Sequence, residues 1–148
     1  STQGYSSAAS DVYKRQLYSG QPNYSGLNTE IAIKMGAIGA EMLSGQSPTS
    51  AKAAYNAFNG EVTISATTVS GRANAGFTLV FSGLSKEACV QMASSDWGSG
   101  SGSGLVSVQA GTATAGTTAS GTLPLNLATA AGGCNQEGDS NKVTWVYY

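Results

Sequence analysis

Two cysteines, Cys89 and Cys134, are the residues with the most definite chemistry in this sequence of 148 residues. No other ligand-rich cluster accompanies them, so they predict one disulfide and an oxidising compartment, with two buried free thiols as the alternative. Closing the loop between them would restrict the unfolded chain by about 4 kcal/mol in the chain-entropy model. A domain with so few charged residues could need such a cross-link.

The chain has no histidine, which removes the commonest general base, most zinc sites and every Ser-His or Cys-His nucleophile pair. None of its lysines has a serine three positions earlier, so the Ser-x-x-Lys arrangement of some serine enzymes is absent as well. The glycines of the Gly98–Gly104 run do not have dinucleotide-binding or P-loop spacing, and they indicate a surface loop. The sequence therefore predicts that the protein is not an enzyme and needs no cofactor.

One segment places oxygen-bearing side chains at every second position, a spacing that calcium loops use because alternate residues can converge on one ion. Its members are Asn135, Glu137, Asp139 and Asn141. A solvated turn before the last strand is the commoner explanation of such a pattern. We expect no metal here, with calcium as a weak candidate.

Composition limits the class of protein. Apolar residues make up 41% and charged residues 10%, with a net charge of −1 and a pI near 5.2. That balance provides no basic surface for nucleic acid and no polybasic membrane patch. No apolar run approaches the 18 residues of a membrane helix, and the length fits one domain spanning residues 1–148.

The chain's most informative stretch predicts a strand followed at once by a helix. Apolar residues alternate through residues 76–82, which is the period of a buried strand. Ser85 can cap the helix that follows, and Glu87 lies in its first turn, where the helix dipole favours negative charge. Cys89 and Met92 would then share the inner face of that helix.

An earlier helix is expected, with Asn28 or Thr29 as its cap and its end at Ser44-Gly45. Its apolar face would consist of residues at helical spacing: Ile31, Met35, Ile38 and Met42. Gly36 and Gly39 lack bulk on this helix. They predict close packing, either against a helix of a neighbouring subunit or within the domain.

The remaining elements are short. Alternation predicts strands at 62–66, 105–109 and 143–147, and the first of them follows a turn at Asn59-Gly60. We expect a loop at 70–76, an exposed loop or irregular edge strand at 111–121, and one helical turn within 123–131. The fold class is therefore α+β, with N-terminal helices followed by an antiparallel sheet.

The order and spacing of these elements over residues 18–148 resemble the type IVb pilins of Gram-negative bacteria, and most closely the major subunits called PilS. Three segments carry the resemblance: the Gly83–Met92 run after an apolar strand, Tyr24–Leu27 before a helix, and Asn56–Gly60 before the first strand of the sheet. Cys134 matches the second cysteine of the C-terminal region that pilins call the D-region.

This resemblance implies a pilin fold whose D-region, residues 89–134, is closed by the disulfide Cys89–Cys134. It also implies that the chain is N-terminally truncated, because pilins begin with a long apolar helix that anchors them in the inner membrane. Residues 1–17 would be a remnant or a replacement of that first helix. The candidate subunit contacts are on the earlier helix: Ile31, Met35, Gly36 and Gly39.

As a pilin, the protein would be a structural subunit that passes from the inner membrane and periplasm into an extracellular surface filament. Its partners would be other pilin subunits, together with host cells, recipient cells or phage. The filament would serve adhesion, aggregation or conjugation. No nucleic acid is expected as a partner, and the membrane would be contacted only through the missing helix.

Two other functions are also compatible with the sequence. A minor pilin or a type II secretion pseudopilin would share the architecture, and calcium binding at residues 135–141 would favour the pseudopilin. A secreted carbohydrate-binding module is the alternative from another class. Its stacking residues would be the aromatic side chains of Trp97, Trp145, Tyr147 and Tyr148.

Overall fold

The computed structural model describes residues 23–97, 104–111, 113–117 and 123–148. The expectations for residues 1–17, and nearly all of the glycine and serine run before Leu105, lie outside these ranges. The chain forms two compact units, one reaching to Leu79 and including Tyr148, the other comprising Val80–Tyr147. Within the described residues, no helix is long and apolar enough to cross a membrane.

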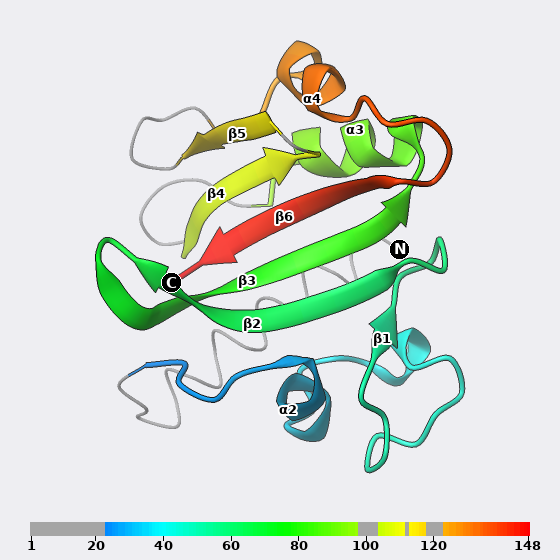
Figure 1. Cartoon of the computed structure of the whole chain (residues 1–148), viewed down its shortest axis with the longest axis vertical. Coiled ribbons are helices and arrows are strands. Elements are labelled where there is room, and N and C mark those ends of the chain that lie inside the picture. Colours follow the sequence, from blue (N-terminus) through cyan, green and yellow to red (C-terminus); the bar gives the residue numbers. More distant parts are fainter. Residues whose placement is uncertain (1–22, 98–103, 112, 118–122) are drawn as a thin grey trace. The chain divides into compact units, whose positions relative to one another are not determined.

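The first unit contains a helix, a 3-10 turn and a β-hairpin (Figure 1). Its elements are α2 (Thr29–Lys34), η1 (Ala40–Met42), β1 (Ala54–Tyr55), β2 (Glu61–Val69) and the first part of β3 (Arg72–Leu84). Strand β1 is antiparallel to β2, with Ala54 opposite Val62. Val62 and Ile64 are buried, as their alternation predicted.

The earlier helix is much shorter than the sequence predicted. Asn28 caps it by accepting a hydrogen bond from the Ile31 amide, but the helix ends at Lys34. Gly36 then adopts a φ of 78°, a left-handed conformation that interrupts the helix. The single apolar face extending to Met42 was therefore a wrong expectation, because the helical period does not continue through Gly36.

The inward face of this segment also differs from the prediction. Ala32 and Ile33 are the buried residues of α2, whereas Ile31 is 42% exposed. Ala37, Ile38 and Met42 are buried further along the chain. A helix continuing to Met42 predicts Ile31 on the inner face. Because the helix ends at Lys34, the residues before and after Gly36 do not share one helical face.

The expected loop at 70–76 is instead a tight turn. Ser70 and Gly71 both have positive φ values, of 52° and 77°, which suits a two-residue hairpin connection. Strand β3 therefore starts at Arg72 and includes the predicted 76–82 strand, in which Phe77, Leu79 and Phe81 are buried. The Tyr24 ring packs edge-on against Phe77, with ring centroids 5.1 Å apart.

The second unit continues from β3 into two helices and three further strands. These elements are α3 (Lys86–Ser94), β4 (Leu105–Ala110), β5 (Ala113–Thr117), α4 (Leu127–Gly133) and β6 (Asn141–Tyr147). In the sheet the hydrogen-bonded order is β1-β2-β3 and then β3-β6-β4-β5. The last strand in sequence thus lies between β3 and β4 (Figure 1).

Most expectations for this unit are confirmed. Strand β4 covers the predicted 105–109, and β6 covers 143–147. The 111–121 segment contains the edge strand β5, which is antiparallel to β4 with an irregular register. Helix α4 starts four residues later than the segment predicted to hold a helical turn and continues to Gly133. The fold is therefore α+β with an antiparallel sheet, as predicted.

Candidate functional site

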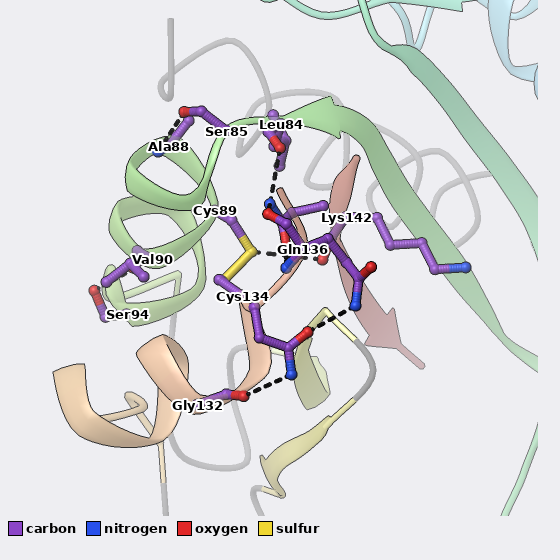
Figure 2. The surroundings of a disulfide bond; sticks show 12 residues. Leu84, Ser85, Ala88, Cys89, Val90, Ser94, Gly132, Cys134, Gln136 and Lys142 are labelled. Carbon is purple, nitrogen blue, oxygen red and sulfur yellow. Dashed lines mark hydrogen bonds between the residues drawn. A yellow bond between two sulfur atoms is a disulfide. The ribbon is translucent and has the colours of Figure 1, made fainter. Parts of the chain in front are cut away.

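The disulfide joins the inner side of α3 to the end of α4 (Figure 2). Cys89 and Cys134 are both buried, and their Cα atoms lie 5.8 Å apart. The Cys89 sulfur is also 3.8 Å from the backbone carbonyl oxygen of Lys142, at the start of β6. Two helices and the last strand therefore meet at this cross-link, which the two cysteines alone had predicted.

Helix α3 presents Cys89 because its start is determined by local chemistry. Ser85 caps the helix, with its hydroxyl oxygen accepting a hydrogen bond from the Ala88 amide at 3.1 Å. Cys89 and Met92 are then buried on one face, as predicted from their spacing. Helix α4 is capped in the same way by Asn126. Each of the two capped helices therefore carries one cysteine of the buried disulfide, Cys89 within α3 and Cys134 at the end of α4.

Two glycines allow α4 to approach the sheet closely. A Cβ atom added to Gly111, just after β4, would overlap the backbone carbonyl group of Gly133 at the end of α4. A Cβ atom at Gly133 would in turn overlap the carbonyl group of Ala110. Gly111 has a φ of 60°, and its amide donates a hydrogen bond to the Lys142 carbonyl at 2.7 Å. Sequence reasoning missed this contact, although Gly132-Gly133 next to a cysteine was the available signal.

Asn141 connects the end of β3 to the segment before β6. Its side chain is 1% exposed, and its amide nitrogen donates to the carbonyl oxygens of Leu84 at 3.2 Å and Gln136 at 2.9 Å. Its side-chain oxygen accepts a hydrogen bond from the Gln136 amide at 2.9 Å. The side chain is thus used inside the protein, where an unpaired amide would be costly.

The other three members of the proposed calcium set are exposed. Glu137 is exposed and forms an ion pair of 2.7 Å with Lys86, which lowers the pKa of its carboxyl group. Asn135 donates to the carbonyl of Gly132, and Asp139 lies on the surface. The described residues contain no group of three or more acidic, cysteine or histidine side chains able to hold a metal ion.

The aromatic residues proposed for glycan stacking are mostly part of the core. Trp145 is 1% exposed and Tyr147 is 6% exposed. Trp145 packs edge-on against Phe81 and against Trp97, with ring centroids 5.2 and 5.4 Å apart. The expectation that Trp145 and Tyr147 could form a binding platform was therefore wrong, because no ring face is available to a sugar. Tyr148 alone of the four has an exposed fraction as large as 44%.

The candidate subunit contacts lie at the surface of the first unit. Ile31 is one of four large apolar residues exposed among the described residues, Met35 is half-buried, and Gly36 and Gly39 are exposed. On the same helix, Glu30 and Lys34 form an exposed ion pair of 3.1 Å.

Comparisons with known proteins find one matching family and solved structures of similar fold. A family model described as PilS N terminal matches residues 9–148. The fold is similar to that of a type IV b pilin from Salmonella typhi, with a TM-score of 0.65, 18% identity, and coverage of 97% of this chain and 95% of that chain. It is also similar to TcpA, a type IV pilin from Vibrio cholerae El Tor biotype, with a TM-score of 0.50, 15% identity, and complete coverage of both chains. None of the curated proteins matches.

Proposed function

We propose that this chain, which belongs to the PilS family, acts as the repeating structural subunit of a type IVb pilus. The observation that carries the proposal is the family match over residues 9–148, joined to a type IV pilin fold whose C-terminal region is closed by Cys89–Cys134. Members of such a family build filaments, so catalysis is not required of this chain.

The arrangement around the disulfide supports a mechanical role. Polymer subunits must keep their surfaces in place under load, and a cross-link between the inner faces of two helices limits how far either can move. The buried position of both cysteines protects the bond from exchange with external thiols, because a thiolate must reach the sulfur to attack it. The D-region would then be a rigid part of each subunit.

The proposed subunit contact is a surface of the first unit that begins on α2 and continues into the segment after it. Its members are Ile31, Met35, Gly36 and Gly39. Ile31 is 42% exposed, and Gly36 and Gly39 a few residues later are exposed too, so the segment offers an apolar side chain and two positions without bulk to an approaching chain. A neighbouring subunit that covered Ile31 would remove this apolar area from water.

For the finished filament we propose an extracellular position and a role in adhesion, aggregation or conjugation. Subunits would pass through the inner membrane and periplasm before assembly. Host cells, recipient cells and phage are the proposed contacts of the fibre. Each role has its own assay: binding to host cells, sedimentation of cell aggregates, or transfer frequency between strains.

The proposal is tested by deleting the gene in its own bacterium and examining sheared surface fibres by electron microscopy. Gold-labelled antibody raised against residues 23–148 should decorate fibres of the parent strain along their length. Fibres should be missing from the deletion strain and return on complementation. Unlabelled fibres that persist in the deletion strain would overturn the proposal.

The contact surface is tested in the complemented strain by Ile31→Glu. A charge in a buried interface carries a large desolvation cost, so piliation should fall sharply while the isolated chain keeps its thermal midpoint. Lys52→Glu, at another exposed position of the same unit, is the matched control and should leave piliation unchanged. Normal piliation in the Ile31→Glu strain would exclude this surface without affecting the proposed function.

A further inference from the structure

The turn that connects β1 to β2 contains a reactive pair of residues. Asn59-Gly60 is the one Asn-Gly dipeptide in the sequence. The amide nitrogen of a residue that follows asparagine can attack the asparagine side chain, and glycine hinders this attack least because it has no Cβ atom. Asn59 is exposed to solvent and has a φ of 64°.

The side chain of Asn56 accepts a hydrogen bond from the backbone nitrogen of Gly60, which is the atom that would attack Asn59. The Gly60 amide donates a hydrogen bond to the Asn56 side-chain oxygen at 3.1 Å, and the Phe58 amide donates to the same oxygen at 2.9 Å. The Asn56 backbone closes the turn by donating to the Gly60 carbonyl at 2.8 Å and accepting from the Asn59 amide at 3.0 Å. Both Asn56 and Gly60 are buried.

We propose that Asn59 is a latent deamidation site and that the Asn56 side chain keeps it unreactive in the folded protein. In the reaction the Gly60 amide nitrogen loses its proton and bonds to the Asn59 side-chain carbonyl carbon, and ammonia leaves. Water then opens the resulting succinimide ring to aspartate or isoaspartate. No oxidant or reductant is required. While the Gly60 N–H is bonded to Asn56, this nitrogen cannot turn toward the Asn59 side chain.

The modification would alter the turn in two ways. It adds one negative charge close to Glu61, which starts β2 opposite Tyr55. Isoaspartate also inserts an extra carbon into the backbone between residues 59 and 60. The hydrogen bonds that Asn56 makes across the turn could not all re-form around that longer backbone. The pairing of β1 with β2 would therefore weaken.

The test compares deamidation rates by peptide mass spectrometry after incubation of the whole chain at mildly alkaline pH. A synthetic peptide of residues 55–61 supplies the rate without the fold. Asn56→Ala removes the acceptor, whereas Asn56→Asp keeps an oxygen at the same place. Phe58→Ala is the control for a change in the same turn that leaves the acceptor untouched.

The folded chain should deamidate at Asn59 much more slowly than the peptide. Asn56→Ala should be about three- to tenfold faster than the parent chain, as expected for losing one hydrogen bond. Asn56→Asp and Phe58→Ala should stay close to the parent rate. The proposal is overturned by a parent rate equal to that of the peptide, by an unchanged rate in Asn56→Ala, or by equal acceleration in Phe58→Ala.

Discussion

The backbone amide of Ile64 donates a hydrogen bond to the side-chain hydroxyl of Thr29 at 3.1 Å. Two residues further along β2, the Ala66 amide donates to the carbonyl of Leu27 at 3.2 Å. Strand β1 pairs with β2 only at residues 61 and 62, and the start of α2 with the residues just before it supplies acceptors further along β2. Thr29 was considered as a helix cap, but Asn28 has that role and Thr29 serves the sheet.

Thr29→Val should lower the free energy of unfolding by about 1–2 kcal/mol, because valine has nearly the same shape but leaves the Ile64 amide without its acceptor. Thr29→Ser keeps the hydroxyl and should recover most of that loss. Urea denaturation of the three chains measures the difference. Equal midpoints for Thr29→Val and the parent chain would show that water or another group replaces the hydroxyl without cost.

Gly111→Ala and Gly133→Ala should each destabilise the protein by about 2–3 kcal/mol, because the new methyl group would overlap a backbone carbonyl. Gly132→Ala is the matched control. A Cβ atom there meets nothing within 4 Å, and alanine favours the helix more than glycine, so stability should be equal or higher. The thermal midpoints of the three variants and the parent chain measure these differences. A tolerated Gly111→Ala would mean that α4 moves easily from the sheet.

Removing the disulfide by Cys89→Ser with Cys134→Ser should cost about 4 kcal/mol, since the bridge closes a loop of 45 residues in the unfolded chain. Cys134→Ser alone should lose both stability and piliation in the complemented strain. Thermal denaturation of the double variant and of the parent chain, both without reductant, gives the comparison. Equal midpoints for the two chains would contradict this expectation.

Alkaline pH should reduce stability through Tyr147. Burial raises the pKa of this tyrosine from 10.0 to about 12. Between these values the unfolded chain releases the phenolic proton while the folded chain keeps it, so the stabilisation is complete below pH 10 and is lost as the pH rises to 12. The difference corresponds to about 2–3 kcal/mol. Denaturation at pH 8 and pH 11 should show a smaller loss for Tyr147→Phe; equal losses would refute the assignment.

Calcium should leave the thermal midpoint unchanged relative to a chelator. The Asn141 side chain already bonds Leu84 and Gln136, and Glu137 is paired with Lys86. Binding calcium through these residues would have to break contacts that hold the β6 entry in place. A clear upward shift with calcium would favour the pseudopilin alternative.

Some features follow from residues adjacent in sequence, and these were predictable. The cap at Ser85 and the alternation of Phe77, Leu79 and Phe81 depend on short-range rules, and the cross-link follows from a count of two cysteines. A cap needs a side-chain oxygen three residues before an amide, and a buried strand needs every second residue apolar. For this reason the strand, the helix and the cross-link were all found from the sequence.

Other features depend on which surfaces meet in space. Whether Ile31 or Ile33 faces inward depends on where the helix ends and what covers it, and both residues fit a helical period. Trp145 and Tyr147 suit a core and a sugar platform equally well until β6 is seen between β3 and β4. The sequence by itself determined the strand at 76–82, the capped helix after it and the two cysteines that can form one disulfide. Only the tertiary structure decided which faces are buried. Burial depends on what packs against a helix or strand, whereas a sequence pattern describes that helix or strand alone.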